Sequence, residues 1–390
     1  MNTKKLFFFA IEALGLAACN NDEVVEVNKA VAEANTISFR PLTNKATRAT
    51  EKMAFTSSDV INVWSTLGAS SYFENINFTY DGTSFKSAAN QTYYWPSSIS
   101  NSNKVSFFAT YGATQSAAGQ LASATYDGET DVLFAKKEFE AKPSDGVGTL
   151  NFRHALSEIE VKAKNTNAGL EVSITGVRIG YVAKTASFSY TGGVTDQNTN
   201  DWKNAGSATL IVQNDWTKTT PSSPSTDVYE KTASVSMTLT GVQSSSNITG
   251  LTPWMLVPQS LALSTSPTNY TQKYKNGTKG SASSEANLNC AYIALKMAIK
   301  NNDASKTSIV SEQWCYWPIT TSWDPGKKYT YVVDVAGGGY QPTNVDTAES
   351  DELDPVLKNL AIQFNPCTID VWVTDLNANS TADDDIQVAN

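Results

Sequence analysis

Few residues of this chain have the chemistry needed for catalysis, and they do not cluster in the sequence. The 390 residues include one histidine, His154, which any serine or cysteine hydrolase site or histidine-bearing metal site would have to use. His154 precedes a stretch in which Ile159, Val161 and Ala163 alternate with charged residues, the period-two pattern of a strand. We therefore expect His154 to be a packed or capping side chain. The sequence predicts no catalytic residue and no enzyme.

The acidic and sulfur-containing residues also lack the spacing of a recognised site. Glycoside hydrolysis needs a pair of carboxylates, and no Asp or Glu pair stands out from surface charge. The acidic runs Glu349–Asp354 and Ala382–Asp385 lack the alternating ligands and the glycine of a calcium loop. Cys290, Cys315 and Cys367 have no close partner in sequence, which indicates small buried side chains with at most one disulfide. We expect no metal and no cofactor.

The remaining cysteine has a distinct context near the start of the chain. Lys4 and Lys5 precede a mostly apolar run, Leu6–Ala18, and Cys19 follows at once. This is the layout of a secretory signal. A helix of that length spans about 20 Å, which is too short for a bilayer core of roughly 30 Å. Residues Leu16–Cys19 resemble a bacterial lipobox, in which the signal peptidase cuts before the cysteine and the thiol carries lipid.

Lipid on Cys19 would hold the chain at a membrane outside the cytoplasm. Two or more acyl chains give stable anchoring, at about 0.8 kcal/mol for each buried CH₂ group. Residues 20–31 would then serve as a polar tether. The alternative is an ordinary export signal in which the cysteine is incidental.

Composition indicates a β-rich protein that works outside the cytoplasm. Charged residues make up 17% of the sequence, against about a quarter in typical domains, and there are 16 Tyr, 15 Phe and 9 Trp. β-branched and aromatic residues favour strands, and the abundant short polar residues favour turns. The net charge of −9 repels phosphate backbones, so we expect no nucleic-acid partner.

Period-two patterns recur along the chain between turn residues, and no long stretch has helical apolar spacing. We therefore predict an all-β fold of antiparallel β-sandwiches. The charged stretch 136–148 is predicted to link two domains, and the polar stretch 214–231 is predicted to be an exposed excursion. The longest clean strand pattern covers Gly148–Lys164. Asn289–Lys300 could be helix or strand, and we assign it to a strand.

Four local patterns together, in this order, resemble the fimbrillin family, the type V pilins of Bacteroidetes with their anchor and tip relatives. The patterns are Thr47–Thr50, Leu150–Ala163, Trp254–Ser260 and Trp317–Val335. They are spread along nearly the whole chain. The resemblance implies a lipidated precursor and two transthyretin-like β-sandwich domains in tandem. It also implies assembly by strand exchange after a trypsin-like protease trims the N-terminus at an arginine.

One of the four arginines is best placed for that cleavage. Arg153 and Arg178 lie in predicted strands, and the proline after Arg40 blocks most trypsin-like enzymes. Arg48 lies in a polar, loop-like stretch, where nicking is easiest. The bond between Arg48 and Ala49 is therefore the expected scissile bond. The alternative is that Arg48 is an ordinary surface charge.

Cleavage there would release the lipid together with a predicted strand. Loss of that strand would leave an unpaired sheet edge and an apolar groove, which a strand of another chain could fill. Pairing of this kind is head to tail and propagates as a filament. The removable strand begins with Thr36, Ile37, Ser38 and Phe39. The candidate donor strand lies within 359–376 and carries apolar side chains at Ile362, Phe364, Ile369, Val371 and Val373. The same segment could instead be an ordinary strand of its own domain.

These inferences define a domain plan. Residues 1–18 form a lipoprotein signal peptide, and residues 19–48 form the lipidated tether with the removable strand. Residues 49–147 form an N-terminal β-sandwich domain, and residues 148–390 form a C-terminal β-sandwich domain with the candidate donor strand.

The expected function is that of a fimbrial subunit at the surface of the outer membrane, serving adhesion. Its expected partners are other pilin subunits, the maturation protease and, before processing, the membrane. The alternative is a lipoprotein that stays anchored, as a fimbrial anchor or tip adhesin or a glycan-binding module. A cluster of aromatic residues could form a platform for a host glycan: Trp314, Tyr316, Trp317 and Trp323. However, Trp317, Trp323 and Tyr331 fall in a family pattern that indicates core packing.

Overall fold

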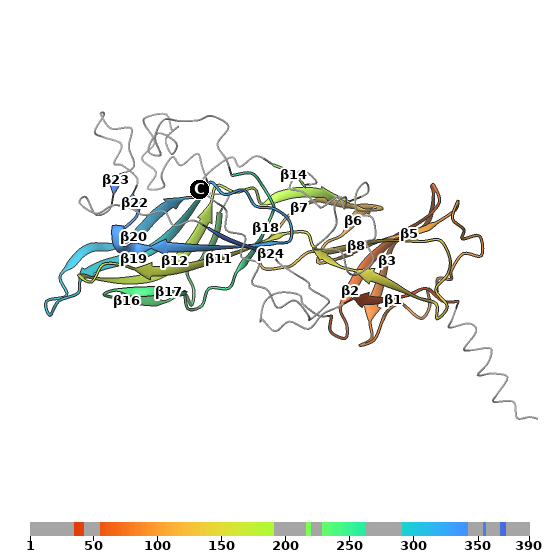
Figure 1. Ribbon diagram of the computed structural model, residues 1–390, viewed down its shortest axis with the longest axis horizontal. Coiled ribbons are helices and arrows are strands. Elements are labelled where there is room, and N and C mark those ends of the chain that lie inside the picture. Colours follow the sequence, from red (N-terminus) through yellow and green to blue (C-terminus); the bar gives the residue numbers. More distant parts are fainter. Residues whose placement is uncertain are drawn as a thin grey trace, which may run out of the picture.

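The computed structural model describes residues 35–42, 55–190, 216–219, 228–261, 291–341, 354–355 and 367–371. Within these ranges the chain consists almost entirely of β-strands and connecting turns, with one short 3-10 helix, η2 (Val335–Gly337), and no α-helix (Figure 1). The prediction of an all-β protein is confirmed. No helix among these residues has the length and apolar character needed to cross a bilayer.

The strands of the first half follow the alternating segments of the sequence. Gly148–Lys164, predicted as one strand, forms parts of three. In chain order the strands are β1 (Ser38–Leu42), β2 (Val60–Leu67), β3 (Ser70–Tyr80), β4 (Phe85–Ser87), β5 (Val105–Tyr111), β6 (Gln115–Ala117), β7 (Gln120–Thr125), β8 (Leu133–Phe139), β9 (Val147–Asn151), β10 (Arg153–His154) and β11 (Ser157–Asn165).

The second half continues in the same manner. The ambiguous stretch Asn289–Lys300 is a strand, as predicted. The strands are β12 (Leu170–Gly180), β13 (Thr185–Ser189), β14 (Trp216–Lys218), β15 (Val228–Lys231), β16 (Met237–Thr240), β17 (Gln243–Asn247), β18 (Trp254–Leu256), β19 (Tyr292–Asn301), β20 (Ser308–Pro318), β21 (Lys327–Asp334), β22 (Tyr340–Gln341), β23 (Asp354–Pro355) and β24 (Thr368–Val371).

The first sheet is rolled, and we call it the first lobe. Its eight strands follow the order β10-β8-β5-β2-β3-β4-β1-β9. Only Phe152 separates β9 from β10, so the two ends of this order lie next to each other. The rolled sheet encloses a core of aromatic rings, in which Phe39, Phe78 and Phe107 are fully buried.

The second lobe is a sandwich of two sheets. One has five strands, in the order β17-β11-β21-β24 with β18 paired to β11. The other has seven strands, in the order β15-β12-β19-β20-β22-β23 with β16 paired to β12. Ile159, Val172, Leu295 and Tyr329, from four different strands, meet in the core between the two sheets. The alternation seen in the sequence places these side chains inward and their neighbours along each strand on the opposite face of the sheet.

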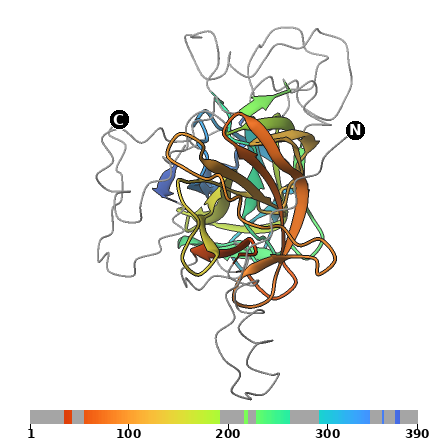
Figure 2. The same ribbon diagram turned by 90° about the vertical axis from the view of Figure 1, so that its right-hand side faces the viewer.

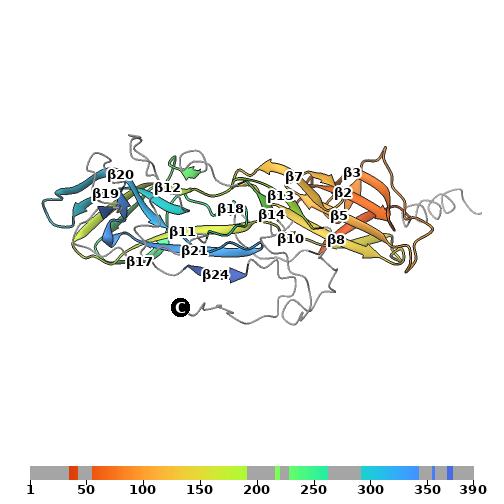
Figure 3. The same ribbon diagram turned by 90° about the horizontal axis from the view of Figure 1, so that it is seen from above.

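A third cluster of apolar residues, the junction core, joins the two lobes. The four-stranded sheet β14-β13-β7-β6 combines β6 and β7 from the first half with β13 and β14 from the second. Phe108 and Phe134 of the first lobe pack in this cluster with Phe188, Trp216 and Val257. Figures 1 and 3 show this small sheet between the lobes, and Figure 2 looks along the long axis with the first lobe in front. The lobes are therefore packed together rather than merely tethered.

Buried amides satisfy backbone groups at this junction. The Gln115 side-chain nitrogen donates to the carbonyl oxygens of Asn62 and Phe108, at 3.0 and 2.9 Å. Its oxygen accepts from the Tyr190 hydroxyl at 3.1 Å. Gln259 makes comparable bonds beside β18. Because an unmade hydrogen bond in a buried site costs about 1–3 kcal/mol, these amides stabilise the strands and turns around the junction.

Two expectations about chain organisation are wrong. Residues 136–148, predicted to be a linker, begin inside β8 and end in β9, and both strands belong to the first sheet. Residues 214–231, predicted to be an exposed excursion, contain β14 and β15. Their Trp216 and Tyr229 side chains are only 2% and 3% exposed, because they fill the junction core and the second lobe.

The chain crosses from the first lobe to the second lobe within Gly148–Lys164, although the sequence pattern is continuous there. β9 and β10 belong to the first sheet, whereas β11 lies at the centre of the five-stranded sheet. Sheet membership therefore places the crossing after His154. The proposed domain ranges 49–147 and 148–390 remain predictions, and these pairings favour a boundary a few residues later.

Because the junction core is buried, we expect that removing one of its aromatic side chains strongly destabilises the protein. Phe188→Ala removes a ring that is 2% exposed and stacked 4.8 Å from Trp216, so we expect a loss of about 3–5 kcal/mol in the free energy of unfolding. Denaturant titration followed by tryptophan fluorescence measures it. Ser187→Ala, on the opposite face of β13, is the control and should change stability by less than about 0.5 kcal/mol. Equal effects of the two substitutions would contradict the role given to the junction core.

Candidate functional site

The leading strand β1 lies inside the first sheet with a partner on each side. It pairs antiparallel with β4, where Phe39 lies opposite Phe85. On its other edge it pairs parallel with β9, where Phe39 lies opposite Gly148. Just before β1, the Ile37 nitrogen donates to the Tyr93 carbonyl oxygen at 2.8 Å. The segment is thus held by backbone hydrogen bonds along both edges.

The side chains of this segment fill the centre of the first lobe. Ile37 and Phe39 are both 0% exposed. The Phe39 ring meets Phe78 and Phe107 edge to face, with centroids 5.1 and 4.9 Å away. A side chain at position 148 would lie 3.2 Å from the Phe39 ring, so the glycine leaves room for it. Such edge-to-face pairs each add about 0.5–1.5 kcal/mol beyond the burial of their area.

The next residues of β1 alternate between the outer and inner faces of the sheet. Arg40 points outward, is about half exposed and pairs with Asp145 at 3.5 Å. Pro41 is buried, and the strand continues through it to Leu42 beside β9 alone. The four residues named as the removable strand, Thr36 to Phe39, therefore all contribute backbone pairing or buried side chains to the first lobe.

Taking this segment away would leave a slot. β4 would keep only β3 as a partner, β9 would lose the strand it pairs with, and the core around Phe78 and Phe107 would lose one wall. Unpaired strand edges next to apolar surface are templates for another strand. The geometry is thus suited to accepting a strand, provided that the leading segment departs.

Unlike β1, which has a partner on each side, the last described strand, β24, is an outer strand of the five-stranded sheet. It pairs antiparallel with β21, and Ile369 lies opposite Tyr329. Ile369 is half-buried and packs on the core of the second lobe, whereas Thr368 is exposed. Figure 3 shows β24 along the margin of that lobe. Its single partner strand makes it easier to detach than β1.

Not all predicted site residues fall among those described. Val371 belongs to β24, and β24 and β1 lie in different sheets, so the structure does not bring the candidate donor to the slot. The lipidation residue Cys19, the scissile pair Arg48 and Ala49, and the donor residues Ile362, Phe364 and Val373 lie outside the described residues.

His154 is a packed side chain, as predicted. Its Nδ1 lies 2.9 Å from the Asp131 carboxylate, and the two side chains are 1% and 4% exposed. The pair belongs to the region where the first lobe meets the junction core. No group of three or more His, Cys, Asp or Glu suited to a metal occurs among the described residues. A substrate in solution would not reach this pair.

The aromatic cluster that could have formed a sugar platform lies mostly in the core. Tyr316, Trp317 and Trp323 are 2%, 4% and 0% exposed. Only Trp314 is partly exposed, and the Arg178 guanidinium lies over its ring at 4.3 Å. Within the described residues, this excludes a stacking surface built from the cluster.

The buried cysteine of β20 behaves as a small apolar side chain. Cys315 is 0% exposed, and burial raises the pKa of its thiol to about 12. No disulfide joins it to Cys367, which is partly buried and packs on the core of the second lobe. Both observations agree with the expectation of small buried hydrophobes.

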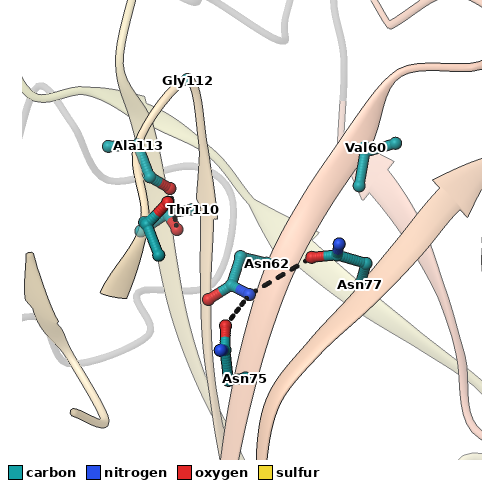
Figure 4. Close-up of a pocket in the computed structure, with 8 residues that line it drawn as sticks. Val60, Asn62, Asn75, Asn77, Thr110, Gly112 and Ala113 are labelled. Carbon is teal, nitrogen blue, oxygen red and sulfur yellow. Dashed lines mark hydrogen bonds between the residues drawn. The ribbon is translucent and has the colours of Figure 1, made fainter. Parts of the chain in front are cut away.

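A polar hollow on the first lobe was not predicted from the sequence. It has a volume of about 310 Å³ and lies over β2, β3 and β5 (Figure 4). Asn62 lies at its centre, with its amide nitrogen 2.6 Å from the Asn75 side-chain oxygen and 3.3 Å from that of Asn77. The only signal was the set of asparagines in two adjacent alternating strands, which a sequence without known register does not align.

The described fold is that of an all-β protein whose leading strand completes its first sheet. A search of curated protein sequences gives no significant match. The fimbrillin-like family matches residues 47–350, which is most of the chain. The protein belongs to the fimbrillin-like family.

Solved structures with partial likeness include a fimbrial protein from Bacteroides vulgatus, with 12% identity, a TM-score of 0.46, and coverage of 87% of this chain and 100% of the other. A candidate cell adhesion protein from Bacteroides uniformis has 15% identity, a TM-score of 0.42, and coverage of 87% and 99%. One from Bacteroides ovatus has 15% identity, a TM-score of 0.42, and coverage of 87% and 98%. Likeness at this level does not define a function.

The burial of β1 leads to a direct test of its contribution to the uncleaved protein. Phe39→Ala should cost about 3–5 kcal/mol in the free energy of unfolding, because it opens a cavity between Phe78 and Phe107. Arg40→Ala, the next residue along the strand, removes only an exposed ion pair and should cost at most about 1 kcal/mol. Urea titration of both variants gives the comparison, and a Phe39→Ala effect no larger than that of Arg40→Ala would show that β1 is not part of the core.

Proposed function

We propose that this protein is a structural subunit of a cell-surface fimbria that assembles by donor-strand exchange and serves adhesion. The observation that carries the proposal is the position of β1, a leading strand that has a partner on both edges and whose Phe39 side chain, like that of Ile37 just before it, is 0% exposed. A strand in that place can be replaced only by another strand with alternating apolar side chains. Membership of the fimbrillin-like family supports this use of the slot.

The proposed sequence of events begins with export. The chain is exported as a lipoprotein, and lipid on Cys19 holds it at the outer membrane. A trypsin-like protease then cuts between Arg48 and Ala49, a bond in the polar stretch between β1 and β2. The cut separates β1 from the rest of the chain, so that β1 and the lipid can leave together.

The proposed donor is the C-terminal segment of a neighbouring subunit. β24 already forms backbone pairs in register with β21, and it alternates an inward Ile369 with an exposed Thr368. Because β24 lies at a sheet margin, detaching it breaks hydrogen bonds along one edge only. Insertion between β4 and β9 would form bonds along two edges, so the exchange gains pairing.

A second candidate function is that of a fimbrial anchor or tip protein that stays on the membrane. The observation in its favour is that β24 is paired within its own lobe, as an ordinary strand would be. The two candidates differ in the N-terminus of the protein found on cells. A lipidated Cys19 start would support the anchored protein, and an Ala49 start in sheared filaments would support the subunit.

Processing is tested by substituting the scissile arginine. Arg48→Ala should leave a chain that retains the lipid and gives no filaments, because β1 stays in the slot. Arg40→Ala is the matched control and should process normally, since Arg40 lies within a paired strand and precedes a proline. N-terminal sequencing and electron microscopy of sheared material give the result. Filaments from the Arg48→Ala variant, with its N-terminus uncut, would refute cleavage at this bond.

The donor strand is tested separately from processing. Ile369→Lys places a charge on the inward face of β24 and should abolish filaments, because a lysine ammonium is not tolerated in the core of the first lobe. Thr368→Lys changes the exposed neighbour and should assemble as the unmodified protein does. Both variants should yield folded, cleaved monomer. Assembly by both variants would show that β24 is not the inserted strand.

A further inference from the structure

The slot that holds β1 is longer than the pairings with β4 and β9 alone indicate. The residues Asn35–Ile37, which lead into β1, run antiparallel to the segment Tyr93–Trp95, which we call the strap. The Ile37 nitrogen donates to the Tyr93 carbonyl oxygen at 2.8 Å. At the other end of the strap, the Trp95 nitrogen donates to the Asn35 carbonyl oxygen at 2.9 Å. The leading segment, residues 35–42, is therefore paired along its whole described length.

The strap lies on the same edge of the leading segment as β4. Backbone groups of alternate residues in a strand point to the same edge, and Asn35 and Ile37 alternate with Phe39, which pairs with β4. On the opposite edge, β9 begins with Val147 opposite Ser38. The leading segment thus enters the slot between the strap on one side and the start of β9 on the other.

Contacts with the rest of the first lobe also hold the strap in place. The Tyr72 hydroxyl of β3 donates to the Tyr94 carbonyl oxygen at 2.6 Å. The centroid of the Tyr93 ring lies 4.8 Å from that of Phe73, which is also on β3. The strap is therefore attached to β3 through groups outside the leading segment, and its position does not depend on that segment alone.

One side chain of the strap reaches across the slot. The Trp95 indole nitrogen donates to the carbonyl oxygen of Gly146 at 2.7 Å, and Gly146 directly precedes β9. The indole is 4% exposed and meets Phe107 and Phe139 edge to face, with centroids 5.5 and 5.1 Å away, so it lies on the core side of the leading segment. Neither end of this bond belongs to the leading segment, yet the bond joins the two sides of the slot.

The indole also lies where the apolar pocket ends. Ile37 and Phe39 are 0% exposed, whereas Asn35, the preceding residue of the same parity, is exposed. An incoming strand therefore finds room for apolar side chains at the places of Ile37 and Phe39. A polar residue suffices at the place of Asn35, next to the strap.

We infer that Trp95 is a positioning residue, which keeps the emptied slot at the width of one strand and so prepares it for a strand of a second copy of this chain. The bond to Gly146 uses no atom of the leading segment, so it persists after that segment departs. Without the bond, the strap and the start of β9 move relative to each other, and only the fraction of molecules with the right spacing binds a strand. The inference rests on the proposed function, since it concerns the slot after one strand leaves and before another enters.

The test uses the full chain, cut after Arg48 with an arginine-specific protease. The cut chain is diluted stepwise, and the fraction that keeps its leading segment gives the dissociation constant of that segment. Trp95→Phe keeps an aromatic ring but removes the indole N–H. It should raise the dissociation constant about tenfold, the result expected if about a tenth of the emptied molecules keep the right spacing.

The matched control is Trp216→Phe. The Trp216 indole also donates to a backbone carbonyl oxygen, that of Ala155 at 2.9 Å, and is 2% exposed, but it lies in the junction core. Its dissociation constant should equal that of the unmodified chain. Equal constants for all three chains, or an equal rise in both variants, would overturn the inference and leave the proposed function intact. A leading segment that is never replaced by an excess of a synthetic peptide of residues 35–42 would instead contradict the proposed function, and the inference with it.

A second measurement needs no substitution in the slot. Exchange of the Trp95 indole proton with solvent, followed by NMR, should stay slow after the leading segment has been removed, as slow as that of Trp216. Fast exchange of the Trp95 proton in the emptied chain would show that the bond to Gly146 breaks when the strand leaves, and would overturn the inference.

Discussion

The architecture depends on hydrogen bonding along both edges of one short leading strand. β1 comes from the part of the chain that precedes every other strand described, yet it lies between β4 and β9 near the end of the rolled sheet. The side chains of Phe39 in β1 and of Ile37 just before it are both 0% exposed. In the strand order of the sheet, β8 lies near one end and β9 lies at the other. A strand between β4 and β9 is therefore needed to close the rolled sheet. The first lobe is therefore complete only when the slot is filled.

This constraint sets β1 apart from β24. Both are short strands near the ends of the described chain, and both place apolar side chains inward. β1 has two partner strands and 0% exposure of Phe39, whereas β24 has one partner and a half-buried Ile369. A strand gains more apolar contact and more hydrogen bonds in the slot than at the margin of the second lobe. Movement of a strand from the margin of the second lobe into the slot is therefore favourable. The core residues of the two lobes do not have to rearrange for this.

The sequence was informative where a property is local. Alternation predicted that Asn289–Lys300 forms a strand, which is β19, and the absence of helical spacing predicted an all-β chain. It also predicted that His154 is a packed side chain, although its partner Asp131 could not be inferred because the two approach only through folding. The removable strand was predicted from its four residues, and its position between β4 and β9 required the pairings.

Other features depended on contacts between distant segments. A period-two pattern continues unchanged when a chain leaves one sheet for another, so β9 to β11 looked like one strand. Polar neighbours in the sequence gave no sign that Trp216 is buried, because the residues that surround it in the junction core are distant along the chain. The asparagines of the polar hollow come together only through the register of β2 with β3, which is not visible in a sequence.

The junction core also has a mechanical consequence. The Trp216 indole donates to the Ala155 carbonyl oxygen at 2.9 Å, and the Met255 nitrogen donates to the Gly128 carbonyl oxygen at 2.9 Å. A pull on opposite ends of the molecule therefore strains these bonds and the stacked rings together instead of stretching a loose hinge. The two lobes resist such tension as one stiff rod, and the molecule would lengthen only after the whole contact ruptures.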